Sequence, residues 1–125
     1  MSKKTIDVDW LPKGGPYSHA VEAGDFIFVS GMVPVDPGKN IAIKDDIKAA
    51  TGLVLDNIKK LLESSGSSLK KAVKVTVFLK DISEFGAMNE VYAKYFPEER
   101  PARSCVAVKD LPGDFPVEIE LIAFK

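Results

Sequence analysis

The sequence predicts an α+β fold, in which a mixed sheet carries two helices on one face. The expected order along the chain is three strands, a helix, a strand, a helix and two strands. Residues 72–80 alternate between apolar and polar side chains, which is typical of a half-buried strand. The two strand–helix–strand crossovers then favour a sheet whose two helices cover a single face.

The first part of the chain is predicted to form strands. Residues 3–8 are expected to be a short first strand. Residues 17–22 and 26–30 are apolar and rich in β-formers, and residues 23–25 include a glycine and an aspartate, which predicts a hairpin. The loop 34–40 carries two prolines and a glycine and closes this first group of strands.

Residues 45–65 predict the first helix, because apolar residues recur there every three or four positions. Asp45 and Asp46 lie at its start, where the helix dipole favours negative charge, and Gly66 is suited to end it. The apolar face comprises Ile47, Ala50, Val54, Ile58 and Leu61, widened by Leu55 and Leu62.

The same periodicities predict the remaining elements. In the strand at 72–80, Val73, Val75, Val77 and Leu79 face one way, and Lys74, Thr76, Phe78 and Lys80 face the other. Asp81 followed by Glu84 resembles a capping box, and Pro97 ends the helix that follows. The apolar stripe of this helix comprises Phe85, Met88, Val91 or Tyr92, and Tyr95. Two late strands lie within residues 100–108 and 117–124.

Length and composition favour one small globular domain over residues 1–125, since 46% of its residues are hydrophobic. The 17 basic and 18 acidic residues are interspersed and leave a net charge of −1, which makes nucleic acid an unlikely partner. The N-terminus lacks the apolar core of a signal peptide, and no apolar run approaches the ~20 residues that span a bilayer. We therefore expect a cytoplasmic protein without membrane contact.

The chain has one cysteine, Cys105, and one histidine, His19. A single cysteine excludes a disulfide within the chain. One cysteine and one histidine are also too few ligands for an ordinary structural zinc site. The sequence therefore predicts chemistry without a metal or an organic cofactor.

The helix-free face of the sheet is expected to be apolar. The strand FIFVS at residues 26–30 is apolar on both sides, and Phe78, Val106 or Cys105, and Ile122 or Phe124 would join it. Apolar patches of this kind usually mark an interface. We therefore expect a homo-oligomer, with sites at subunit boundaries.

An arginine and two glutamates lie on the two late strands. Arg103 offers a planar fork that matches a carboxylate, and a glutamate on a neighbouring strand would orient or deprotonate a water beside the bound acid. Glu118 and Glu120 share one side of their strand, so partial burial would raise at least one pKa. Two alternatives remain open: the glutamates form only the solvated side of the strand, or they act as a carboxylate pair of the glycosidase type.

Three further residues are candidates for chemistry. Cys105 shares a face with Arg103, and a small packing residue is a better interpretation of it than a nucleophile. His19 is better interpreted as a packing or hydrogen-bonding residue than as a general base. Gly31, after Ser30, would allow the backbone to approach a small anion closely, although an ordinary turn explains it equally well.

Five segments, in this order, resemble the RidA/YjgF family of enamine and imine deaminases, also labelled endoribonuclease L-PSP: GGPYSHA, FIFVSGMVP, NEVYAKYF, PARSCVAV and VEIELIAF. The resemblance runs from about Gly14 to the C-terminus and implies a chorismate-mutase-like protomer. It also implies a homotrimer with a central barrel and clefts between subunits.

Within that resemblance, Arg103 would hold the substrate carboxylate and Glu118 would position or activate the hydrolytic water. Tyr17, Ser30, Gly31, Asn89 and Cys105 would line the cleft. The implied substrates are 2-aminoacrylate and related 2-imino acids, and the products are a 2-keto acid and ammonia. Two other readings stay open: a non-enzymatic module that binds small metabolites or partner proteins, and, with less support, an endoribonuclease.

Two positions depart from the family pattern. Met32 stands where many members have glutamine, and His19 also replaces a glutamine. Each change is expected to alter substrate preference or pH response. The loop 97–100 is also shorter than in some relatives.

Overall fold

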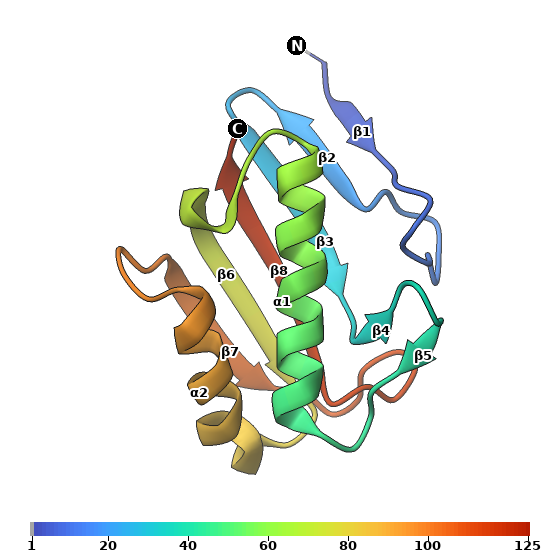
Figure 1. Cartoon of the computed structure of the whole chain (residues 1–125), viewed down its shortest axis with the longest axis vertical. Coiled ribbons are helices and arrows are strands. Elements are labelled where there is room, and N and C mark those ends of the chain that lie inside the picture. Colours follow the sequence, from blue (N-terminus) through green and yellow to red (C-terminus); the bar gives the residue numbers. More distant parts are fainter. Residues whose placement is uncertain (1) are drawn as a thin grey trace.

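A computed structural model describes residues 2–125 and has a six-stranded sheet with two helices over one face (Figure 1). The strand order is β1-β2-β3-β8-β6-β7, and the β6–β7 pair is parallel while the other neighbours are antiparallel. This confirms the predicted mixed α+β sheet. The strands are β1 (Lys4–Ile6), β2 (Ala20–Ala23), β3 (Phe26–Met32), β6 (Ala72–Leu79), β7 (Ala102–Ala107) and β8 (Val117–Phe124), and the helices are α1 (Ile47–Ser64) and α2 (Phe85–Tyr95).

The core lies between the helices and the central strands. Val75 and Val77 of β6 and Ile119 of β8 are fully buried, and each alternates with a more exposed neighbour. Burying a valine or isoleucine side chain stabilises a fold by roughly 1.5 to 3 kcal/mol, so this alternation decides which face the helices cover. The face predicted from residues 72–80 is confirmed from Val75 to Leu79, whereas at the start of β6 Ala72 is buried and Val73 is not, because the pairing register shifts between Ala72 and Lys74.

Helix α1 begins and ends where the sequence predicts. The Asp46 carboxylate accepts a hydrogen bond from the backbone N–H of Ala49 at 3.1 Å and caps the first turn. Gly66 lies just after the helix with φ of +85°, a conformation that favours glycine.

The start of α2 differs from the prediction. A 3-10 turn, Ile82–Glu84, precedes the helix, and the Asp81 carboxylate accepts from the N–H of Ser83 at 2.9 Å rather than from that of Glu84. Met88 and Tyr92 are buried as expected, whereas Phe85 of the predicted stripe is exposed. Phe96, the residue that follows the helix, lies outside the predicted stripe but is also buried, and its ring packs against that of Tyr92 with the centroids 4.6 Å apart.

The strands also differ from the prediction in several places, and β1 covers only Lys4–Ile6 of the predicted residues 3–8. Strand β2 begins only at Ala20, because the preceding residues bond to the N-terminal segment. Strand β3 continues past Ser30 to Met32 across a β-bulge that lies between the pairs Val29–Leu121 and Met32–Ile119. The loop predicted at 34–40 contains part of a small hairpin, β4 (Val35–Asp36) and β5 (Ile41–Ala42).

The helix-free face carries exposed apolar side chains, as predicted. Phe28 pairs with Ile122, and Phe26 pairs with Phe124. The rings of Phe26 and Phe124 are stacked, with their centroids 5.6 Å apart. Val106, not Cys105, lies on this face, because Cys105 pairs with the buried Val77 in the parallel β6–β7 ladder. None of the helices among residues 2–125 is long and apolar enough to cross a membrane.

Candidate functional site

The seven candidate residues separate into two groups on opposite faces of the sheet. Glu118 pairs with Phe78, which lies on the helix-free face, whereas Arg103 pairs with Val75, which lies under the helices. Strand β6 also separates β7 from β8. We expected the glutamate to lie on a strand next to that of Arg103, and within one chain this expectation is wrong. The order of strands in a sheet is set by tertiary pairing and not by their order in the sequence.

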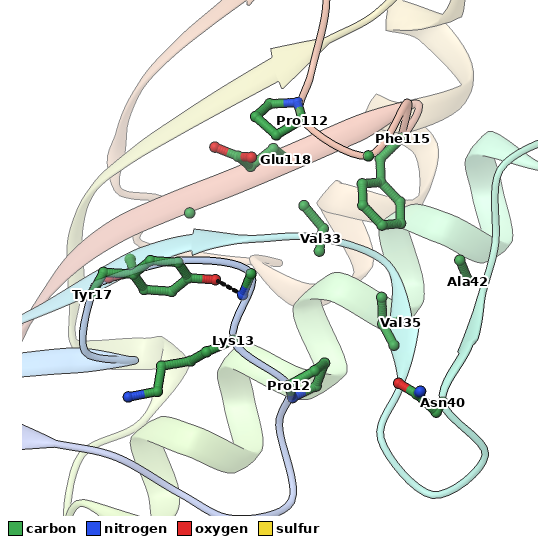
Figure 2. Close-up of a pocket in the computed structure, with 14 residues that line it drawn as sticks. Pro12, Lys13, Tyr17, Val33, Val35, Asn40, Ala42, Pro112, Phe115 and Glu118 are labelled. Carbon is green, nitrogen blue, oxygen red and sulfur yellow. Dashed lines mark hydrogen bonds between the residues drawn. The ribbon is translucent and has the colours of Figure 1, made fainter.

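The first group lines a pocket of about 670 Å³ (Figure 2). Glu118 projects from β8, while Ser30 and Gly31 contribute from the bulge in β3. Tyr17 reaches the pocket from the loop before β2, and its hydroxyl accepts a hydrogen bond from the N–H of Gly14 at 3.0 Å. The Ser30 hydroxyl donates to the carbonyl of Ser18 at 2.6 Å, so its proton is engaged in fixing the loop that carries Tyr17.

Gly31 is required by the position of Glu118. A Cβ atom added to Gly31 would lie 2.8 Å from Cδ of Glu118, too close for any real contact. Because Gly31 has no side chain, the Glu118 carboxylate can lie over β3 at Gly31 and line the pocket. The structure therefore gives Gly31 a positional role, in place of the ordinary turn that the sequence left open.

The environment of Glu118 makes its carboxylate a stronger base. Burial raises the pKa of Glu118, and repulsion from the Glu120 carboxylate on the same side of β8 raises it further. The expected same-side placement and raised pKa are thus confirmed. A carboxylate whose pKa lies closer to neutral accepts a proton from water more readily.

The second group surrounds Arg103 on the helix side of β7. Its Nη1 donates to Oδ1 of Asn89 at 2.7 Å, and its guanidinium lies 4.7 Å from the ring centroid of Tyr92 and 5.6 Å from that of Phe85. Among residues 2–125, Asn89 is the one hydrogen-bond partner of the Arg103 guanidinium. The other N–H groups of the guanidinium are therefore available to bind a carboxylate. Sequence reasoning missed the two aromatic partners, although both lie on one helical stripe.

Cys105 belongs to the Arg103 group and is half-buried. Burial raises the pKa of the Cys105 thiol, and the positive charge of Arg103 offsets only part of that rise. The thiol therefore stays protonated, which supports the interpretation of Cys105 as a packing residue and not as a nucleophile.

His19 is buried outside the pocket wall that holds Glu118. Its Nδ1 accepts a hydrogen bond from the backbone N–H of Val8 at 3.1 Å, and its Nε2 lies 3.3 Å from the carbonyl oxygen of Pro12. Because an N–H only donates, Nδ1 is unprotonated and both ring nitrogens are engaged. His19 is therefore a hydrogen-bonding residue, and Met32 is likewise packed in the core.

Several lining residues were not predicted. Val33, Val35 and Ala42 extend the pocket toward the small β4–β5 hairpin, and Phe115 closes it from the loop before β8 (Figure 2). Their only sequence signal is apolar character in segments that otherwise look like loops. No three His, Cys, Asp or Glu side chains within residues 2–125 lie together in a way that would hold a metal ion.

The comparisons with known proteins cover nearly the whole chain. The family model described as endoribonuclease L-PSP matches residues 10–125. A RutC family protein of Pyrococcus abyssi is 50% identical over 100% of this chain and 99% of that protein. A 2-iminobutanoate/2-iminopropanoate deaminase of Salmonella typhimurium is 40% identical over 98% of each chain. The crystal structure of Escherichia coli TdcF with bound serine is 37% identical, covers 98% of each chain and superimposes with a TM-score of 0.90.

Proposed function

We propose that this chain, which belongs to the endoribonuclease L-PSP family, also called RidA/YjgF, hydrolyses 2-imino acids to 2-keto acids and ammonia. The observation that carries the proposal is the half-buried Glu118 carboxylate, which lies against Gly31 in a pocket with Tyr17 and Ser30. The Salmonella relative named as an imino-acid deaminase supports this reaction class. The serine bound to the E. coli relative supports a small ligand with an α-carboxylate.

Hydrolysis would proceed in two steps, addition of water and loss of ammonia. The oxygen of a water bonds to the imine carbon, the C=N electron pair moves to nitrogen, and one water proton passes by way of Glu118 to that nitrogen. The hydroxyl proton of the resulting carbinolamine then follows the same route. The C–N bond breaks with its pair on nitrogen, ammonia leaves, and a 2-keto acid remains.

Glu118 alone cannot hold an acid substrate, because its carboxylate and that of Glu120 repel a third. Lys13 also lines the pocket, but its ammonium is paired with the Asp7 carboxylate at 3.0 Å. The cation that we assign to this task is Arg103, which is held toward α2 by Asn89 and by the rings of Tyr92 and Phe85. Since Arg103 lies on the opposite face of the same sheet, we propose that it serves the Glu118 pocket of a second copy.

The proposed assembly is a homotrimer. Phe28 and Val106 on the helix-free face are 43% and 45% exposed, and pairing this face between copies would remove it from water. Threefold closure would leave no unpaired apolar face and would supply each pocket with one arginine. We expect light scattering to give a molar mass three times the 13.6 kDa of one chain. A molar mass equal to that of one chain would contradict the trimer.

Mixing two inactive variants tests the shared site. Arg103→Ala and Glu118→Gln should each lose turnover of freshly generated 2-iminopropanoate relative to its spontaneous hydrolysis. If each site draws its arginine and its glutamate from different copies, an equal mixture assembled together should recover about a quarter of the wild-type rate. Mixed assemblies without any recovery would show that a site does not draw its Arg103 and its Glu118 from different copies.

Ribonuclease activity, which the family model's description names, fits the site less well. The one histidine is buried with both ring nitrogens engaged, and it lacks the free nitrogen that an acid–base role in RNA cleavage needs. A module that binds metabolites without turnover would require Arg103 but not Glu118. Full binding of a 2-keto acid with no imine turnover in the wild-type protein would favour that alternative.

A further inference from the structure

The Glu118 pocket continues well beyond the residues that would hold a three-carbon acid. From Glu118 and Gly31 it runs along Val33 to the β4–β5 hairpin (Figure 2). Apart from Asn40 at its far end, the side chains along this extension, which we call the apolar groove, share aliphatic or aromatic character. They are Val33, Val35, Ala42, Pro112 and Phe115.

One wall of the apolar groove is tied to the core. The side-chain amide of Asn57, buried on α1, donates to the carbonyl of Val35 at 2.9 Å. The N–H of Ile43 donates to the carbonyl of Pro34 at 2.9 Å and joins the two ends of the hairpin segment. The groove is therefore anchored to α1, the longer of the two α-helices.

The opposite wall is set by the orientation of Phe115. A Cβ on Gly113 would lie 2.9 Å from Cδ2 of the Phe115 ring, and Gly113 has φ of +83°, so the ring packs where only glycine leaves space. The ammonium of Lys44 lies 5.4 Å from the centroid of that ring. Asp114, next to Phe115, forms an ion pair with Lys80 that holds the loop.

We infer that the apolar groove receives the side chain of the 2-imino acid, so that this chain prefers substrates with larger apolar side chains to the methyl-bearing three-carbon imine. The inference rests on the proposed function. The imine carbon bears a carboxylate, a nitrogen and a side chain in one plane. With the carboxylate on an arginine and water beside Glu118, the groove is the apolar direction that remains for the side chain.

A substrate series tests the preference. Imines generated by an L-amino-acid oxidase from alanine, 2-aminobutyrate, norvaline and leucine should show kcat/KM rising along the series. Each methylene moved from water into the groove is expected to contribute up to about fourfold. We expect at least a tenfold gain from alanine to leucine, and a parallel rise in affinity for the matching 2-keto acids by calorimetry. A flat or falling series would overturn the inference and leave the proposed function standing.

A steric variant locates the effect. Ala42→Phe fills the groove from β5 and should lower the leucine-to-alanine ratio of kcat/KM by about tenfold. Ile41→Phe is the matched control, because Ile41 is the adjacent residue on β5, is 56% exposed and does not line the pocket. Its ratio should equal that of the wild type, and an equal fall in both variants would overturn the inference.

A near-isosteric variant covers the case in which Ala42→Phe does not fold. Val35→Thr keeps the shape of the wall but adds a hydroxyl, and it should lower the same ratio several-fold. An unchanged ratio in folded Val35→Thr and Ala42→Phe would overturn the inference. If no imine is turned over, the proposed function fails, and the calorimetric series alone decides whether the groove selects apolar side chains.

Discussion

The Glu118 pocket and the Arg103 group are held in place by different means. Glu118 is positioned by the main chain, since it needs a bulge in β3 and the missing side chain of Gly31. Arg103 is positioned by side chains, through the amide of Asn89 and two aromatic rings of α2. The first region supplies a base and a cavity, and the lysine that lines this cavity, Lys13, is paired with the Asp7 carboxylate. The second region supplies the guanidinium of Arg103. Neither region is a complete site for an anionic substrate.

The largest effect is expected from Glu118→Gln. The amide keeps the size of the side chain but cannot accept the water proton, so turnover of 2-iminopropanoate should fall about a hundredfold or more. Binding of a 2-keto acid should change by only a few-fold, because Arg103 would hold its carboxylate. Stopped-flow turnover and calorimetry measure the two quantities. Full turnover in this variant would remove Glu118 from the chemistry.

Arg103→Lys should have the next largest effect. Lysine keeps the positive charge but loses the planar fork and its stacking on Tyr92. A charge-assisted bond of this kind contributes roughly 1.5 to 3 kcal/mol, so both turnover and keto-acid affinity should fall about tenfold to a hundredfold. A fall in turnover with unchanged affinity would assign Arg103 to a step after binding.

Gly31→Ala tests the main-chain positioning of Glu118. The new methyl group occupies the space of the Glu118 side chain, and displacing that carboxylate should lower turnover by about tenfold or more. The same change in a Glu118→Gln background should cost much less, because Gly31 acts through Glu118. Additive losses in the double variant would mean that Gly31 contacts the substrate independently.

The smallest effect concerns the pH profile. The acid limb of kcat should reflect deprotonation of Glu118, whose pKa lies above its ordinary value, mainly because of burial. Glu120→Gln removes the repulsion that raises this pKa further, so the acid limb should shift to lower pH. The plateau rate should change far less than in Glu118→Gln. A shift to higher pH, or losses as large as those of Glu118→Gln, would instead indicate that the two carboxylates act as a pair.

Much of the fold was predictable because local periodicity decides local structure. The alternation at residues 72–80 predicted β6 and its buried face, and the apolar stripe at 45–65 predicted α1 and both of its ends. Glu118 and Glu120 share a side because the pleat has a period of two, which needs no tertiary information. The β4–β5 hairpin was missed because its two short strands carry no such period.

The sequence by itself determined the fold class, the helix-covered face and the chemical types in the candidate site, because these depend on side-chain chemistry and on periods of two and 3.6 residues. Only the tertiary structure decided that β6 lies between β7 and β8, and that the pairing registers put Arg103 and Glu118 on opposite faces. It also decided that Gly31 makes room for Glu118 and that Phe115 meets Val35 across a groove. Contacts between distant segments depend on strand order and packing, which no local pattern in the chain encodes.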